Sequence, residues 1–463
     1  MTNIILATDS YKHSHFLQYP PEARRISAYV EARTNDFSDR VLFFGLQAFL
    51  LDMLARPIAQ ADIDEADALC AAHGVPFNRA GWEAILTDHN GFLPIEISAL
   101  PEGMIVPTSV PLIQVVNTDD RMPWLATFIE TALLRAVWYP TTVGTLSWMC
   151  KAIIRKGLLK SSDDPEGQLP FKLHDFGARG VSSAESAALG GLAHLVNFMG
   201  SDTMEALLAA RRFYGATDMP AFSIPAAEHS TMTSWGRARE EAAYANMLDQ
   251  FAGEGRIVAV VSDSYDLDKA VTDIWGGSLK DKVLTRQGTL VVRPDSGDPV
   301  ETPVRTVQKL WEAFGGATNS KGFRVLDPHV RVIQGDGMNI KSIAKLVDQM
   351  IDAGFAIDNI AFGMGGGLLQ QVNRDTLRFA MKANAMLTNA NTWVDVSKSP
   401  ATDPTKGSKA GRQAVVMQNG TLVAKRADAL ASGENNLLTP VWRNGELLVR
   451  TTLNEVRKRS VRV

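Results

Sequence analysis

The sequence has only two cysteines among its 463 residues, Cys70 and Cys150. Two thiols cannot form the disulfide framework that stabilises small secreted proteins. The N-terminal residues lack a basic segment followed by a long apolar run, so they do not resemble a signal peptide. No stretch approaches the roughly 20 apolar residues that a membrane-spanning helix needs. We therefore expect a cytoplasmic protein with no membrane partner.

Excess charge is also absent. The chain has 47 Lys and Arg against 51 Asp and Glu, which gives a net charge of −4. A general nucleic-acid binder would carry a strong basic excess, so we expect no nucleic-acid partner and only a local anion site. Hydrophobic residues make up 45% of the chain, and its length is sufficient for two sizeable globular domains.

The sequence pattern changes twice along the chain. Residues 1–145 mix helical and antiparallel strand patterns, including a predicted strand at 4–7, and are expected to form an α+β domain. Within residues 146–385, apolar runs alternate with helical segments, which predicts a parallel α/β barrel. The predicted barrel strands are 171–175, 256–262, 289–293, 330–334 and 359–363. Residues 386–463 are predicted to form a C-terminal segment with β-hairpins.

The hairpins are indicated by Asn419-Gly420 and Asn444-Gly445, which favour tight turns between antiparallel strands. They would either extend the sheet of the N-terminal domain or form a small lobe.

Polar residues follow every predicted barrel strand. In parallel barrels, active sites lie at the carboxyl ends of the strands. In chain order, the residues at these ends are His174, Asp175, Phe176 and Arg179; Asp263 and Ser264; Arg293 and Asp295; Gly335 and Asp336; and Gly363 to Gly367.

The first of these turns combines an acid, Asp175, with the ring of Phe176 and the guanidinium of Arg179. An aromatic face beside a fixed cation suits a flat heteroaromatic ligand next to an anionic group. The alternative is a surface turn with a solvated arginine.

The last two turns are rich in glycine, at 335–337 and 363–367. Glycine lets backbone N–H groups approach a phosphate, and a following helix adds a favourable dipole. Neither spacing matches a P-loop or a dinucleotide fingerprint, so the pattern predicts a monophosphate site. Tight loops with no ligand are the alternative.

Other polar residues have both a structural and a functional interpretation. Asp263 or Ser264 is favoured as a helix N-cap, and Asp202 fits a cap or a ligand contact equally well. Arg293 and Asp295 combine an anion clamp with a carboxylate for sugar hydroxyls or Mg²⁺. His229 begins a helix beside Ser and Glu, which favours chemistry over packing. The residues alone predict a phosphorylated sugar ligand and leave phosphoribosyl transfer, aldolase and epimerase chemistry open.

Nine segments together resemble the nicotinamide phosphoribosyltransferases, of the type II phosphoribosyltransferase family. They are residues 6–12, 18–21, 93–97, 172–183, 223–230, 261–266, 293–297, 332–337 and 362–370. They occur in family order over nearly the whole chain. The resemblance implies an irregular parallel α/β barrel with an α+β domain built from the N- and C-terminal parts. It also implies a homodimer with the active site at the interface. Ala178 and Met364 depart from the aromatic residue and the serine of animal members.

The resemblance also implies residue roles. Phe176 and the partner subunit's Tyr11 would sandwich the nicotinamide ring, and Arg179 would reach its amide or the pyrophosphate. Asp202 would face the carboxamide NH₂, with Ser223 also at the substrate. A carboxylate there accepts from an amide but repels nicotinate.

For the sugar, the resemblance implies that Arg293 holds pyrophosphate and Asp295 the ribose hydroxyls. The implied phosphate contacts are Gly335, Asp336, Gly365, Gly366 and Arg374, with Lys398, Lys406 and Lys409 as further candidates. The lysines could equally form a solvated basic loop.

The implied reaction converts nicotinamide and phosphoribosyl pyrophosphate into nicotinamide mononucleotide and pyrophosphate, in NAD salvage. Mg²⁺ would be the metal, with Asp263 supporting either it or His229. ATP would stimulate the reaction by phosphorylating His229. The alternatives are a nicotinate phosphoribosyltransferase, a non-catalytic binding relative and another sugar-phosphate barrel enzyme.

Overall fold

The computed structural model describes residues 3–399 and 407–461 and divides into two compact units. Unit 1 comprises Met1–Thr145, Ala210–Ala216 and Asn373–Val463, and unit 2 comprises Leu146–Ala209 and Thr217–Val372. The boundary that the sequence placed after residue 385 falls inside β14 (Ala380–Thr388). The two units are therefore described separately.

Unit 1 is built on a seven-stranded antiparallel sheet of order β15-β14-β1-β5-β3-β18-β19. In addition to β14, its strands are β1 (Ala23–Glu31), β3 (Ile95–Ala99), β5 (Ile113–Asn117), β15 (Trp393–Asp395), β18 (Thr439–Arg443) and β19 (Glu446–Leu447). The helices are α1 (Leu46–Phe49), α2 (Gln60–His73), α3 (Arg79–Asp88), α4 (Leu125–Phe128) and α16 (Leu453–Ser460). The sheet and helices share one apolar core, which confirms an α+β unit.

Both predicted hairpins are present. One extends the large sheet and the other forms a small sheet of its own, so each of the two predicted alternatives occurs once. β18 and β19 join the large sheet, whereas β16 (Gln413–Gln418) and β17 (Thr421–Arg426) form a separate two-stranded sheet. A further pair joins β2 (Arg40–Leu42) to β4 (Ile105–Pro107).

The strand predicted at residues 4–7 is wrong. These residues form a turn, in which Asn3 O accepts from Leu6 N at 3.1 Å and Asn3 Oδ1 accepts from Ile5 N at 3.0 Å. Ile5 is fully buried, so its apolar character serves packing and not sheet pairing.

Unit 2 contains a six-stranded parallel sheet of order β7-β6-β13-β12-β9-β8. Its strands are β6 (Leu173–Asp175), β7 (Gly200–Ser201), β8 (Ile257–Val261), β9 (Thr289–Arg293), β12 (Val330–Gln334) and β13 (Ile360–Met364). The five predicted barrel strands are confirmed, and β7 was not anticipated. A small antiparallel pair, β10 (Gly316–Thr318) and β11 (Arg324–Leu326), lies outside this sheet.

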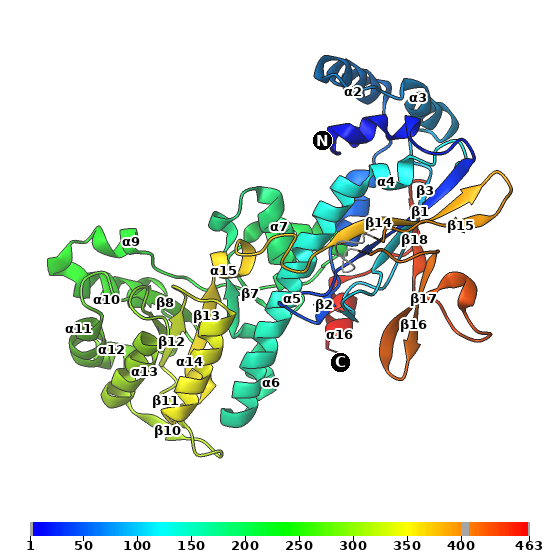
Figure 1. Ribbon diagram of the computed structural model, residues 1–463. Helices are drawn as coiled ribbons and strands as arrows, with labels where there is room; N and C mark the ends of the chain where they lie inside the picture. Colours follow the sequence, from blue (N-terminus) through cyan, green and yellow to red (C-terminus); the bar gives the residue numbers. More distant parts are fainter. Residues whose placement is uncertain (1–2, 400–406, 462–463) are drawn as a thin grey trace. The chain divides into compact units, whose positions relative to one another are not determined.

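Helices surround the parallel strands, as Figure 1 shows for α10, α13 and α14. The helices of unit 2 are α6 (Pro165–Gln168), α7 (Ala184–His194), α9 (His229–Thr233), α10 (Glu240–Gln250), α11 (Leu267–Lys269), α12 (Lys280–Thr285), α13 (Glu301–Phe314), α14 (Ile340–Asp352) and α15 (Gly366–Leu369). A π-helical segment, Ala270–Ser278, follows α11.

Residues 222–227 close the sheet into a barrel. On one side, Phe222 N donates to Met199 O at 2.8 Å, and Phe222 O accepts from Ser201 N beside β7. On the other side, Ala227 N donates to Ala259 O and Ala259 N donates to Pro225 O, each at 2.9 Å. This extended segment therefore satisfies both edges of the sheet with backbone hydrogen bonds.

Two helices contain a boundary between the units, α5 (Glu130–Ser161) and α8 (Met204–Tyr214). Pro140 lies inside α5, and the helix continues through it. Within the described residues, no helix combines the length and apolar character that crossing a bilayer requires.

A buried carboxylate organises part of unit 1. Glu102 accepts hydrogen bonds from Gly45 N and Leu46 N at 2.5 and 2.8 Å, and from the Tyr214 hydroxyl at 3.0 Å. It thus satisfies amide groups at the start of α1 from a distant part of the chain. Burial is the main cause that raises the pKa of Glu102 to about 7, although the hydrogen bonds oppose the shift.

We predict that Glu102 makes unit 1 less stable as the pH rises. Between its ordinary pKa of 4.5 and its folded pKa of about 7, the folded protein keeps a proton that the unfolded chain has lost. The free energy of unfolding should therefore fall over this window, by about 3 kcal/mol in total, and then level off. Urea unfolding at pH values of about 5 to 8 should show this slope in the wild type and not in Glu102→Gln.

The exposed Glu22→Gln is a suitable control and should keep the wild-type slope. Parallel pH profiles for the wild type and Glu102→Gln would contradict the prediction.

Candidate active site

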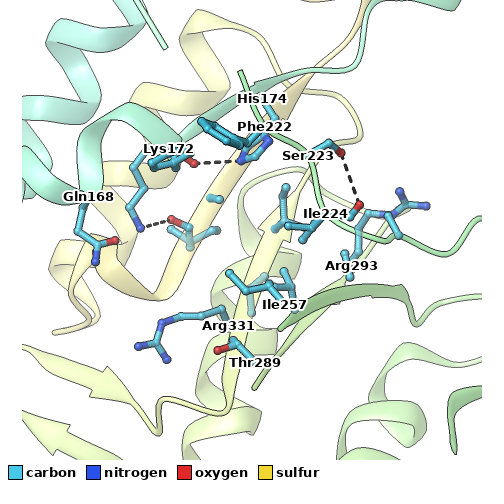
Figure 2. A pocket seen from close by; sticks show the side chains of 18 of the residues that line it. Gln168, Lys172, His174, Phe222, Ser223, Ile224, Ile257, Thr289, Arg293 and Arg331 are labelled. Atoms are coloured by element: carbon cyan, nitrogen blue, oxygen red, sulfur yellow. Dashed lines mark hydrogen bonds between the residues drawn. The ribbon is translucent and has the colours of Figure 1, made fainter. Parts of the chain in front are cut away.

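A cavity of about 480 Å³ lies within the barrel, and residues from both the amino and the carboxyl ends of the strands line it. Four residues predicted from the sequence line it, namely Phe176, Asp202, Ser223 and Arg293. Figure 2 shows Ser223 and Arg293 among the side chains that line this cavity. The barrel topology explains the convergence, because parallel strands place their carboxyl ends at one edge.

The Phe176 ring lies against glycine backbone. A Cβ on Gly363 would be 2.0 Å from the ring atom Cε2, and a Cβ on Gly335 would be 3.3 Å from it. Phe176 N also donates to Met364 O at 3.0 Å. These two glycines, which the sequence associated with phosphate, therefore also make room for an aromatic ring.

Asp202 and Ser223 form a pair that lines the same cavity as Phe176. The Ser223 hydroxyl donates to Asp202 Oδ1 across the junction between β7 and the closing segment. The Asp202 carboxylate is exposed, so it is available to a ligand in the cavity. The pair offers a carboxylate and a hydroxyl at one point, which suits a ligand that carries hydrogen-bond donors.

His229 lies where the loops after β8 and β9 meet. Its Nδ1 is 3.0 Å from Ser264 Oγ, and its Nε2 is 3.6 Å from Asp263 Oδ1 and 3.4 Å from Asp295 Oδ2. The imidazole is about half exposed, whereas the Asp263 side chain is 4% exposed. The histidine therefore presents a ring nitrogen between two carboxylates at an accessible edge.

Asp263 is not the helix cap that the sequence favoured. The cap of α11 is Asp266, whose side chain accepts from Lys269 N at 3.1 Å. Asp263 Oδ2 instead accepts from Asp295 N at 2.9 Å and from the Ser296 hydroxyl, so it holds the loop after β9.

In the candidate site, Arg293 Nε and Asp263 Oδ1 are buried atoms of oppositely charged groups and lack hydrogen-bond partners among the described residues. Buried polar atoms are usually paired in folded proteins, so an unpaired donor and an unpaired acceptor indicate places for ligand atoms.

The two glycine turns differ in the backbone groups that they make available to an anion. Asn339 caps α14 by accepting from Lys341 N and Ser342 N, so those amides are already satisfied. The turn at Gly335 and Asp336 precedes this cap, and Gly365 is the N-cap residue of the short helix α15. An anion would therefore meet the turn residues and the start of α15, including Gly366.

Other predicted residues are not among those that line the cavity. Arg179 is exposed on a short 3₁₀ turn, Ala178–Gly180, after β6. Tyr11 and Arg374 belong to unit 1; Tyr11 is 57% exposed, and Arg374 forms an ion pair with Asp375 at 2.8 Å.

The basic loop gives a mixed result. Lys409 forms an ion pair with the buried Glu31, so it is not the solvated lysine of the alternative interpretation, and its charge is already paired. Lys406 lies outside the described residues. Lys398 contributes to a group of cations around Lys382, together with Arg33 and Arg374.

Lys382 was missed by the sequence reasoning. Burial is the main cause that lowers its pKa, and the three neighbouring cations lower it further. The nearby Glu130 carboxylate opposes the shift, so the group contains an anion as well as cations. The feature of the sequence that could have drawn attention to Lys382 is its position within the otherwise mostly apolar run 380–388.

The cavity continues toward the amino ends of the strands, where Figure 2 shows Gln168, Lys172 and Arg331. Lys172 Nζ donates to three backbone carbonyls, those of Ile357, Asp358 and Ile360, at 2.9 to 3.2 Å. Burial lowers the pKa of Lys172 to about 7. The carbonyls stabilise a cation that lacks bulk water.

Comparison with known proteins gives consistent results. Residues 171–434 match the model of the nicotinate phosphoribosyltransferase (NAPRTase) family, and residues 3–97 match the nicotinamide phosphoribosyltransferase N-terminal domain. A nicotinamide phosphoribosyltransferase of Xanthomonas campestris pv. campestris is 52% identical, over 99% of this chain and 98% of that protein. One from Acinetobacter baylyi is 31% identical, over 99% and 97%.

Two solved structures share the fold. The nicotinate-nucleotide pyrophosphorylase of Pyrococcus furiosus has a TM-score of 0.63 at 16% identity, covering 99% of this chain and 95% of that one. Human nicotinic acid phosphoribosyltransferase has a TM-score of 0.55 at 17% identity, covering 98% and 93%. The predicted fold class, an irregular parallel barrel with an α+β unit, is confirmed.

We predict that Gly363→Ala will displace the Phe176 ring. The added methyl group cannot fit 2.0 Å from a ring carbon, so the free energy of unfolding should fall by about 1–3 kcal/mol. Gly335→Ala is the matched control, since its methyl group would lie 3.3 Å from the same ring and should cost less. Urea unfolding measures both, and equal losses would show that the ring is not fixed against β13.

Proposed function

The chain belongs to the nicotinate phosphoribosyltransferase family, and we propose that it is the member that transfers a phosphoribosyl group to nicotinamide. The products would be nicotinamide mononucleotide and pyrophosphate, which places the enzyme in NAD salvage. The similarity to nicotinamide phosphoribosyltransferases along nearly the whole chain supports this proposal.

The choice of nicotinamide as the proposed substrate rests on the Asp202–Ser223 pair. Nicotinamide ends in an NH₂ group that donates to a carboxylate, whereas nicotinate ends in a carboxylate that Asp202 would repel. The pair lines the same cavity as Phe176, whose ring can stack on a pyridine. A nicotinate phosphoribosyltransferase is disfavoured for the same reason, and the intact set of polar residues disfavours a non-catalytic relative.

The remaining residues would bind phosphoribosyl pyrophosphate. Arg293 has an unpaired Nε for an anionic oxygen, and Asp295 offers acceptors to ribose hydroxyls. The 5′-phosphate would be bound by Gly335, Asp336, Gly365 and Gly366. We also propose a homodimer in which the partner subunit's Tyr11 covers the second face of the ring, with Arg179 at its amide or at pyrophosphate.

In the reaction, the pyridine nitrogen attacks C1′ of the ribose while the bond from C1′ to the pyrophosphate oxygen breaks. The electron pair of that bond leaves with pyrophosphate, and the new bond gives the ring a positive charge. Positioning of the two substrates and stabilisation of the departing anion by Arg293 would supply most of the rate enhancement.

The site also fits Mg²⁺. Asp263 Oδ1 is buried without a hydrogen-bond partner among the described residues, and Asp295 lies beside it on the next loop. Over those residues, no group of three or more His, Cys, Asp and Glu side chains could hold a metal by itself. Mg²⁺ typically binds through one or two carboxylates and substrate phosphates, so Asp263 and Asp295 would hold it, and it would neutralise charge on pyrophosphate.

We further propose that ATP stimulates the enzyme by phosphorylating His229. A ring nitrogen would take the γ-phosphoryl group and release ADP. The ring is about half exposed and is held by Ser264, which suits it for contact with a nucleotide. The phosphohistidine would favour substrate binding and turnover.

We expect Asp202→Asn to admit nicotinate. The change removes a charge-assisted hydrogen bond worth about 1.5–3 kcal/mol, so the KM for nicotinamide should rise roughly 10- to 100-fold. Turnover should be assayed with phosphoribosyl pyrophosphate and Mg²⁺, using nicotinamide or nicotinate, with and without ATP. The exposed Asp218→Asn is the control and should behave as the wild type. Unchanged selectivity in Asp202→Asn would contradict the role of this carboxylate.

We also expect His229→Ala to abolish ATP stimulation while basal turnover persists. Incubation with ATP labelled on its γ-phosphate should give an acid-labile label on the wild type and none on the variant. His73→Ala removes an exposed histidine of unit 1 and should keep the label. A label that remains on His229→Ala would exclude this residue as the acceptor.

A further inference from the structure

Asp175 is a buried carboxylate that none of the proposed chemistry uses. It is the last residue of β6 and is fully buried. The ion pairs of the described residues give it no cationic partner, and burial raises its pKa to about 6, with nearby Asp202 contributing. A buried acid without a counter-charge is costly, so its hydrogen bonds must offset that cost.

These hydrogen bonds join two different loops. Oδ1 accepts from Gly177 N at 2.7 Å, in the turn that carries Phe176. Oδ2 accepts from the Thr203 hydroxyl at 2.7 Å, in the turn that carries Asp202. The backbone also contributes, because Asp202 N donates to Asp175 O at 3.0 Å.

Close packing fixes the side chain between the loops. A Cβ on Gly191 of α7 would lie 3.1 Å from Asp175 Oδ2, 3.1 Å from Thr203 Cγ2 and 2.8 Å from Ala206 Cβ. Because the helix backbone approaches this closely, the carboxylate has little freedom to choose other partners.

Only a carboxylate satisfies both donors at once. Gly177 N–H and the Thr203 hydroxyl each need an acceptor, and an ionised Asp presents two oxygens. An Asn in the same position would present one oxygen and one NH₂ group, so if the oxygen faced Gly177 N–H, the Thr203 hydroxyl would have to accept instead of donate. The choice of Asp therefore has a geometric reason that packing alone does not supply.

We propose that Asp175 is a positioning residue for the ring substrate. It sets the distance between the Phe176 ring and the Asp202 carboxylate, which together would hold nicotinamide. The inference rests on the proposed function, because it assigns the two loops to one ligand. A misplacement of about 1 Å at such a site can cost up to roughly 100-fold in activity.

Thr203 provides the sharpest test, since it is buried and touches Asp175 without belonging to the ligand site. Thr203→Val keeps the shape and removes the hydroxyl donor, whereas Thr203→Ser keeps the donor and removes a methyl group. We expect the KM for nicotinamide to rise about tenfold in Thr203→Val and by less than about threefold in Thr203→Ser, with the KM for phosphoribosyl pyrophosphate unchanged in both.

Asp175→Asn is the second variant and should give the same selective rise in KM. Equal effects in Thr203→Val and Thr203→Ser would overturn the inference. So would a lower melting temperature in Thr203→Val with an unchanged KM for nicotinamide. If the wild type turns over nicotinate instead, the proposed substrate is wrong, and the same comparison with nicotinate then tests the positioning role by itself.

Discussion

Closure of the barrel by residues 222–227 is the constraint on which the site depends. The backbone of this segment bonds to Met199 and Ser201 on one side and to Ala259 on the other. It would leave two sheet edges unpaired if it moved away. The same segment places Ser223 beside Asp202, and its continuation delivers His229 to the loops after β8 and β9. One stretch of backbone thus assembles both the ring pocket and the candidate phosphate acceptor.

The sequence predicted the regular part of this fold well and the closing segment not at all. Runs such as Ile257–Val261 are apolar on both faces, which is typical of buried parallel strands, and the structure confirms them. The closing segment reads Phe-Ser-Ile-Pro-Ala-Ala, with no alternation and with a proline. Its hydrogen bonds go to two different neighbouring segments of the barrel, so no local sequence pattern could have predicted them. The opposite error occurred at Ile4–Ala7, where apolar residues are buried in a turn.

In the candidate site as well, features set by the local sequence could be predicted, whereas features set by contacts between distant segments could not. Phe176 and Arg293 were predicted to meet because they lie at the ends of parallel strands, whereas the family resemblance added Asp202; all three line one cavity. Which carboxylate caps a helix could not be predicted, since Asp263 and Asp266 lie three residues apart in similar sequence. Tertiary contact decided it: Asp263 bonds to the loop after β9, and Asp266 is left to cap α11.

The buried polar groups of unit 2 separate into two kinds, and the difference follows from what each must do. The oxygens of Asp175 accept from fixed donors of the protein, so this carboxylate holds geometry and has little left to offer a ligand. Arg293 Nε and Asp263 Oδ1 have no such partners among the described residues. Phosphoribosyl transfer creates a cation at the ring and releases an anion, and both need partners that the protein has not already satisfied. In this site, a rigid carboxylate that already has its hydrogen-bond partners supports charged atoms that have none among the described residues. This arrangement meets the requirement, because the protein reorganises little when the charges form.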